Sequence, residues 1–171
     1  GEVLFANAGG AGWANPLTGD FEEVRSPGRD GRFYGPLPKT WIDYRGTYVS
    51  GADCVLRYRV GETEVNEWPR LSEVGEEPVF ERHLALGPTA VPMTVRIADR
   101  PGCTQQSLPI LPGFSGLWSQ SGDEQPSVLF AATGQVAGVE WVVVDAQIRL
   151  RVPASQATRV ISLVAMRAAS K

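Results

Sequence analysis

The sequence of 171 residues is poor in the side chains that build metal and heme centres, with two cysteines, one histidine and two methionines. Covalent heme attachment requires the pattern C-x-x-C-H, but Cys54 and Cys103 are far apart and His83 adjoins neither. A zinc site needs three or four protein ligands, mostly Cys and His. We therefore predict no metal and no cofactor for this chain.

Long hydrophobic runs and clustered positive charge are also absent. No apolar stretch approaches the roughly 20 residues that cross a bilayer. The formal net charge is −3, and the arginines stand singly between apolar positions instead of gathering along one face. We therefore predict that neither a membrane nor a nucleic acid is a partner. Hydrophobic residues make up 43% and charged residues 20% of the chain, which is typical of a globular domain.

Two stretches have a superficial likeness to catalytic motifs. The sequence GFSGL at 113–117 lacks the G-x-S-x-G spacing of a nucleophile turn. The sequence AGGAGW at 8–13 lacks the third glycine of a phosphate loop, and the segment WANP at 13–16 cannot open the helix whose N-terminus would hold the phosphate. We predict no catalytic residue here. A pair of loop carboxylates for glycoside hydrolysis stays open, with these candidates: Asp20, Glu22, Glu23, Asp30, Asp43 and Asp99.

From Thr47 onward, apolar and polar residues alternate with the period of two that is typical of half-buried strands. No segment combines a helical period with helix caps. The pattern predicts an all-β, antiparallel β-sandwich of about eight to ten strands. Residues 100–126 are expected to be an irregular excursion from the sheet. The expected strands cover 54–60, 63–68, 80–86, 93–97, 127–131, 139–144, 148–152 and 160–166.

Residues 1–46 have neither a helical nor a strand period after a short apolar run, and they contain nine glycines and four prolines. We expect a long irregular N-terminal arm that packs on a β-sandwich core formed by residues 47–171, within one domain. Irregular segments of this length are uncommon in compact domains and often have a function. Because the chain begins at Gly1 without a methionine, we expect it to be a fragment of a longer one.

Aromatic residues gather in and just after this arm, and two interpretations compete. Flat aromatic rings stack on sugar rings while nearby polar groups bind hydroxyls. Alternatively, the rings anchor an arm that has no regular structure of its own. On the first interpretation, the candidate ligand-binding residues are Trp13, Tyr34, Trp41, Tyr44 and Tyr48, with Asp43 and Arg45 as polar partners.

Five sequence elements carry a resemblance to a known family: LFAN at 4–7, GWANP at 12–16, GRDGRFYGPLP at 28–38, WIDYRGTYVSG at 41–51 and VLRYRVGETEV at 55–65. They resemble an uncharacterised domain of large, modular, secreted proteins of planctomycete and verrucomicrobial type. Such proteins often also carry a propeller similar to sugar dehydrogenases and a c-type cytochrome module. The likeness covers about the first 70 residues. The family has no established catalytic residues to carry over.

The resemblance implies an extracytoplasmic location, periplasmic or secreted, where a disulfide between Cys54 and Cys103 can form. It also implies further strands upstream, and it makes the neighbouring domains of the same parent chain the expected partners. We therefore predict a non-catalytic accessory or interaction domain that binds carbohydrate, with a polysaccharide as ligand. A glycoside-acting enzyme domain with two loop carboxylates and a purely structural spacer are the alternatives.

Overall fold

The computed structural model describes residues 10–109, 111–120 and 126–168, and this part of the chain folds into strands and loops without an α-helix. No helix that could span a membrane therefore occurs in it. The strands are β1 (Ile42–Ser50), β2 (Asp53–Val60), β3 (Thr63–Val74), β4 (Glu77–Leu86), β5 (Met93–Asp99), β6 (Thr104–Ser107), β7 (Phe114–Gln120), β8 (Val128–Gly134), β9 (Glu140–Val144), β10 (Gln147–Val152) and β11 (Arg159–Arg167).

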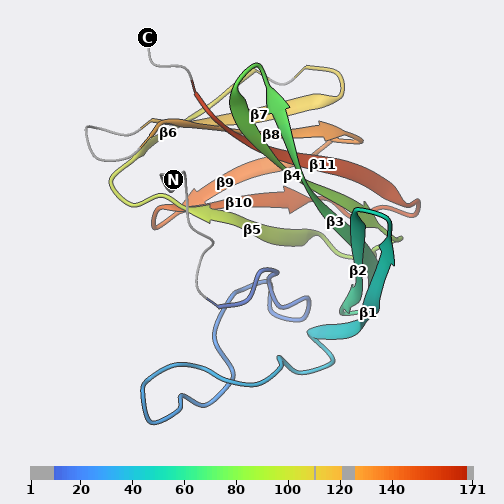
Figure 1. Ribbon diagram of the computed structural model, residues 1–171. Coiled ribbons are helices and arrows are strands. Elements are labelled where there is room, and N and C mark those ends of the chain that lie inside the picture. Colours follow the sequence, from blue (N-terminus) through green and yellow to red (C-terminus); the bar gives the residue numbers. More distant parts are fainter. Residues whose placement is uncertain (1–9, 110, 121–125, 169–171) are drawn as a thin grey trace.

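These strands form two antiparallel sheets, which confirms the predicted all-β sandwich (Figure 1). The larger sheet has the order β1-β2-β3-β4-β11-β8-β7-β6, and the smaller has the order β5-β10-β9. The predicted excursion at 100–126 is wrong in part, because β6 and β7 lie in it. The inward positions of β7 include the buried hydroxyls of Ser115 and Ser119, which hide the apolar alternation that marks a strand.

The core lies between the two sheets and follows the alternation of the sequence. In β2, for example, Tyr58 and Val60 are buried, whereas Arg57 between the inward positions is exposed. The smaller sheet contributes fully buried aliphatic residues at alternate positions, as expected for facing sheets. Fully buried side chains from both sheets include Val65, Leu84, Val95, Phe130, Ile148, Leu150, Val152 and Ile161.

The arm is tied to the edge of the smaller sheet. The Ala14 N–H donates to the Thr94 carbonyl at 2.8 Å, and the Arg96 N–H donates to the Gly12 carbonyl at 2.8 Å. The arm also covers the adjoining sheet surface, where the Phe21 ring lies 4.3 Å from the Arg96 guanidinium and 4.7 Å from that of Arg149. Arginine faces on an aromatic ring add cation–π attraction to the packing. The first strand begins at Ile42, a few residues before the predicted end of the arm.

The two cysteines do not form the disulfide that the resemblance permits. Cys54 lies in β2 and Cys103 lies in the turn before β6, and both are half-buried.

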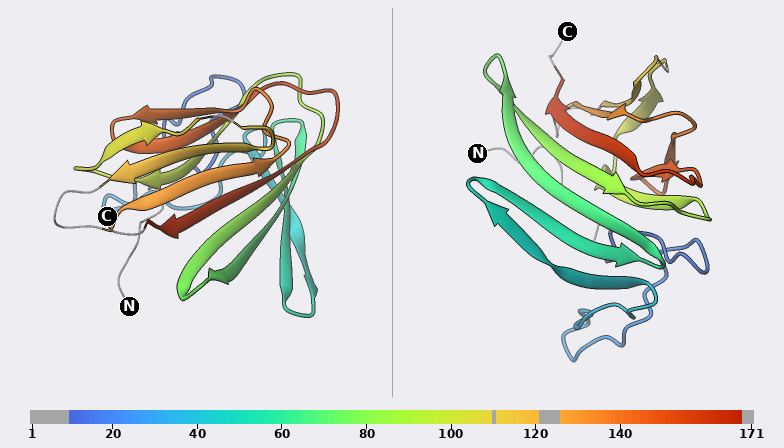
Figure 2. Two further views of the ribbon diagram at one scale, coloured as in Figure 1. Left: turned by 90° about the horizontal axis from the view of Figure 1, so that it is seen from above. Right: turned by 90° about the vertical axis from the view of Figure 1, so that its right-hand side faces the viewer.

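A proline divides the larger sheet into two diverging hairpins. The β2–β3 ladder ends at the pair Leu56 and Glu67, whereas the β3–β4 ladder continues to Val74 and Glu77. Pro69 lies two residues beyond Glu67 in β3, and it has no N–H to donate to a neighbouring strand. Beyond this point the β1–β2 hairpin and the β3–β4 hairpin separate toward their tips (Figure 2). We call the gap between them the fork.

Candidate functional site

Trp13 and Trp41, two of the candidate binding rings, are buried. They are 3% and 1% exposed, respectively. The Trp13 indole N–H donates to the Tyr58 hydroxyl at 2.9 Å, and the Trp41 indole N–H donates to the Trp13 carbonyl at 3.0 Å. Neither ring has a face open to a ligand. Both anchor the arm, as the competing interpretation has it.

Tyr34 is exposed and is held within its own loop. It belongs to a loop closed by a bridge between Pro27 and Phe33, and its hydroxyl donates to the Asp30 carboxylate. Arg32 makes an ion pair with the same carboxylate at 2.8 Å. In Figure 1 the blue arm that carries this loop extends below the two sheets. The contacts of the Tyr34 side chain are thus with Asp30 and Arg32 of its own loop.

A β-bulge decides how the two tyrosines of β1 point. The register shifts between Tyr44 and Gly46, so that Tyr44 lies opposite Tyr58 while Tyr48 lies opposite Val55. Gly46 has a φ of +133°, a conformation that side-chain-bearing residues rarely adopt. Tyr44 and Tyr48 are 63% and 56% exposed, but they lie on opposite faces of the sheet. Only Tyr48 shares a face with Asp43.

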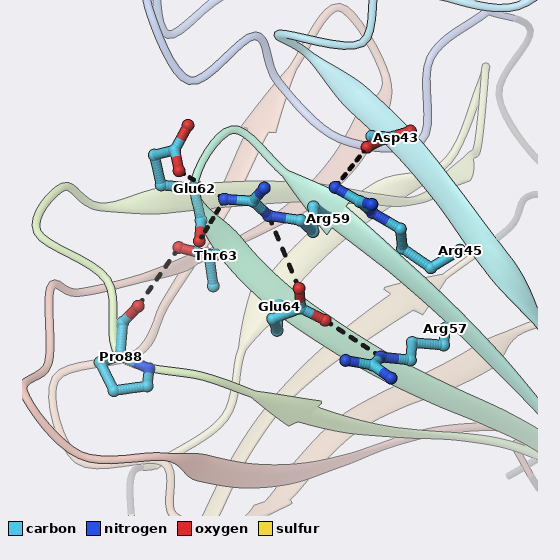
Figure 3. Close-up of polar contacts among 8 residues, drawn as sticks. All are labelled: Asp43, Arg45, Arg57, Arg59, Glu62, Thr63, Glu64 and Pro88. Carbon is cyan, nitrogen blue, oxygen red and sulfur yellow. Dashed lines mark hydrogen bonds and ion pairs between the residues drawn. The ribbon is translucent and has the colours of Figure 1, made fainter.

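The face that carries Asp43 and Tyr48 is turned away from the smaller sheet. We call it the outer face of β1–β4. Its charged part is a ladder of ion pairs across three strands (Figure 3). Asp43 contacts Arg45 at 2.7 Å within β1. The Glu64 carboxylate of β3 makes ion pairs with two arginines of β2, with Arg57 at 3.1 Å and with Arg59 at 3.6 Å. The Arg57 guanidinium also donates to the Tyr48 hydroxyl at 3.4 Å, which connects the ladder to this ring.

Beside this ladder lies an open hollow of about 310 Å³ lined by Asp53, Val55, Trp68 and Arg70. It lies in the fork, where the β2–β3 ladder has already ended. Asp53 and Arg70 form an ion pair of 3.4 Å across the gap. Trp68 is half-buried and forms one wall, while Tyr48 stands next to Val55 through cross-strand pairing. We call this site the fork hollow.

His83 supports Trp68 from the side away from the hollow. The two rings stack with centroids 5.3 Å apart and an interplanar angle of 20°. The His83 Nδ1 is 2.7 Å from the Ser162 hydroxyl, and Nε2 is 3.0 Å from a Glu81 carboxylate oxygen. These contacts fix the imidazole, and through it the indole. Trp68 is thus held in one orientation before a ligand arrives, which lowers the cost of binding.

Ser162, His83 and Glu81 have the order of a catalytic triad but not its surroundings. The Nε2–H of His83 is not aligned with the Glu81 carboxylate for a hydrogen bond. Ser162 lies in the middle of β11, which is paired on both sides with β4 and β8. The backbone N–H groups around it are engaged in the ladders, so they cannot form an oxyanion hole. The three residues therefore act as a brace for Trp68.

Three of the candidate carboxylates are each neutralised by an arginine two positions further on. These pairs are Glu23 with Arg25, Asp30 with Arg32 and Asp43 with Arg45. The repeated spacing acid-x-Arg was visible in the sequence and could have identified them as structural pairs. Within the described residues, no three His, Cys, Asp or Glu side chains group closely enough to hold a metal ion.

The Glu23 pair gives a testable pH dependence. Arg25 donates to the Glu23 carboxylate through Nε at 2.7 Å and Nη2 at 2.6 Å, and through Nη1 to the Gly35 carbonyl at 2.8 Å. The side-chain hydrogen bonds of Arg25 lower the pKa of Glu23 from 4.5 to about 2. Because the folded pKa is depressed, the stabilisation is present above pH 4.5 and is lost as the pH falls through about 2.

An NMR titration of the Glu23 carboxyl carbon should therefore have its midpoint near pH 2. The Arg25→Gln variant should move that midpoint up toward the ordinary value for glutamate. A wild-type midpoint near 4.5 would show that the Arg25 contact does not persist in solution.

One comparison with known proteins returns a match. The model of a family described as a domain of unknown function, DUF6797, matches residues 1–67. The matched segment contains the arm, β1, β2 and the first residues of β3, and therefore the Asp53 and Val55 side of the fork hollow. Trp68 and Arg70 on the other side lie just beyond it. Searches of curated proteins and of solved structures returned no match.

Proposed function

We propose that this chain is a non-catalytic accessory and interaction domain of an extracytoplasmic modular protein, and that it binds carbohydrate in the fork hollow. The observation that carries the proposal is the braced indole of Trp68, which lines an open hollow beside Asp53 and Arg70. An aromatic wall combined with a few fixed polar groups is the usual composition of a small-ligand site.

The side chains that line the fork hollow contact different parts of a sugar. The apolar C–H face of a sugar ring packs against the indole of Trp68 above Val55, which excludes water from both surfaces. Asp53 accepts hydrogen bonds from sugar hydroxyls, and Arg70 donates to sugar oxygens. Both side chains are more than half exposed, so they can reach a ligand without leaving their own ion pair. Charged partners make these hydrogen bonds stronger than neutral ones would be.

The charge pattern of the outer face favours a neutral ligand. Arg45, Arg57, Arg59 and Arg70 each contact a carboxylate on the same face. The surface is therefore rich in hydrogen-bonding groups but offers no unbalanced positive patch of the kind that binds phosphate backbones. Hydroxyl-rich neutral sugars suit such a surface.

The extracytoplasmic setting and the partners within the parent chain rest on the sequence resemblance of the first 70 or so residues. Elements such as GWANP at 12–16 and WIDYRGTYVSG at 41–51 carry it. In this setting, a rigid β-sandwich that holds a polysaccharide would present it to a neighbouring enzyme or redox module.

Calorimetry against a panel of neutral oligosaccharides and polysaccharides tests the proposal. We expect saturable binding of at least one neutral glycan, with a Kd in the micromolar to millimolar range that is typical of small open sites. Chromatography of the glycan after prolonged incubation should show no cleavage. If no glycan binds, the proposed carbohydrate function is wrong, and the result favours a purely structural spacer. If the glycan is cleaved, the domain is an enzyme.

A further inference from the structure

We propose that the ligand is the interior of an extended, neutral, β-linked polysaccharide chain, which crosses the outer face of β1–β4 from Tyr48 to Trp68. This inference rests on the proposed carbohydrate function and specifies the class of glycan. It uses a second aromatic residue, Tyr48, which does not line the fork hollow itself.

The first argument is the spacing of the two rings. Tyr48 of β1 lies opposite Val55 of β2, and Val55 lines the hollow together with Trp68 of β3. Paired strands lie about 4.8 Å apart, which puts residues two strands apart about 10 Å from each other. Because the β2–β3 ladder ends at Leu56 and Glu67, the separation of Tyr48 and Trp68 is at least this large. Two sugar units of an extended β-linked chain span a similar length. The two rings can therefore stack on a sugar and on its next but one neighbour.

The second argument is the shape of the path. On one side it is bordered by the ion pair of Arg57 and Glu64 at 3.1 Å, and on the other by that of Asp53 and Arg70 at 3.4 Å. These pairs place donors and acceptors where the hydroxyls on both edges of a flat sugar chain would lie. A chain that crosses the strands between the pairs therefore meets rings on its faces and polar groups on its edges.

The third argument is that the path is open at both ends. β1 is the edge strand of the larger sheet, so nothing in the sheet follows Tyr48. Past Trp68, the same row of the sheet continues through His83 to the small side chains of Ser162 and Thr133. The row reaches its next bulky side chain, Phe114, only in β7, which is four strands away from Trp68. A site without end walls accepts the middle of a chain, whereas an enclosed pocket selects a chain end.

The test uses β-linked gluco-, xylo- and manno-oligosaccharides of one to six units in calorimetry with the wild-type protein. Affinity should rise by about tenfold or more from one to about four units and then level off, because the second ring is reached only by a longer chain. Reduction of the terminal sugar of a hexamer to its alditol should leave its affinity unchanged. Equal affinity for one unit and six units, or loss of binding on end reduction, would overturn the inference.

Two tyrosines on the same strand provide a matched pair of variants. Tyr48→Ala should lower the affinity for the hexamer by about tenfold and leave the affinity for the shortest binding sugar unchanged. Tyr44→Ala is the control, because Tyr44 is also more than half exposed but lies on the opposite face. Equal effects of the two changes would refute the path from Tyr48 to Trp68. If every glycan fails to bind, the proposed carbohydrate function is refuted. If a glycan binds without length dependence, only the inference of an extended chain is refuted.

Discussion

Replacing Trp68 with alanine is expected to raise the Kd for the bound glycan by about 30-fold, which corresponds to about 2 kcal/mol. The substitution removes the wall on which the sugar face packs, while Asp53 and Arg70 remain in place. Hydrogen bonds alone retain little affinity in an open site, because water competes for them. Calorimetry or a fluorescence titration with the glycan that binds the wild-type protein measures the change.

Two further variants make the Trp68 result interpretable. Tyr44→Ala removes an exposed ring from the opposite face of the sheet, so this variant should bind the glycan as tightly as the wild type does. His83→Phe keeps an aromatic ring beside Trp68 but removes the contacts to Ser162 and Glu81, so we expect a smaller loss than for Trp68→Ala. If Trp68→Ala folds with a normal circular dichroism spectrum and still binds with wild-type affinity, the fork hollow is not the ligand site.

Replacing Trp41 with alanine is expected to lower the free energy of unfolding by about 3–5 kcal/mol, the usual range for large aromatic residues in a core. Trp41 is only 1% exposed, and its indole N–H holds the backbone of Trp13, whose own ring contacts Tyr58. Removing the side chain leaves a cavity and a buried carbonyl without its donor. Urea unfolding followed by circular dichroism measures the loss, and the Tm should fall by roughly 10 °C.

The Trp41 experiment separates anchoring from ligand stacking. Tyr34→Ala, at an exposed ring of the same arm, should change the free energy of unfolding by no more than about 0.5 kcal/mol. Trp41→Phe should lie between the two, because it keeps most of the buried ring area but loses the N–H donor. A Trp41→Ala protein of unchanged stability would mean that the arm is not held by this ring.

The strands that sequence reasoning located well are those with a simple alternation. In β2 the inward positions Leu56, Tyr58 and Val60 differ sharply from their arginine neighbours, so the period of two is unambiguous. β7 was missed because a strand buried on its inner face can use small hydroxyl residues there. Ser115 and Ser119 are buried there, yet in a sequence they resemble a loop.

The candidate site was located only in part, because residue type does not determine which way a ring points. Trp13 and Trp41 were plausible stacking rings until their burial placed them in the core. Trp68 ends a predicted strand, and alternation alone indicates no role for its ring, although Pro69 beside it signals a break in strand pairing. A tryptophan next to a strand proline is the signal that could have pointed to the fork hollow.

The sequence by itself determined the all-β class, the antiparallel sandwich, the irregular arm and the absence of recognisable catalytic motifs. These follow from local periodicity, glycine and proline content and fixed motif spacings, which need no knowledge of distant neighbours. Only the tertiary structure decided which aromatic residues face solvent. The bulge at Gly46 reverses the face on which Tyr48 lies relative to Tyr44, and the end of the β2–β3 ladder opens the space beside Trp68. Both depend on the pairing of strands, which is a property of several segments together.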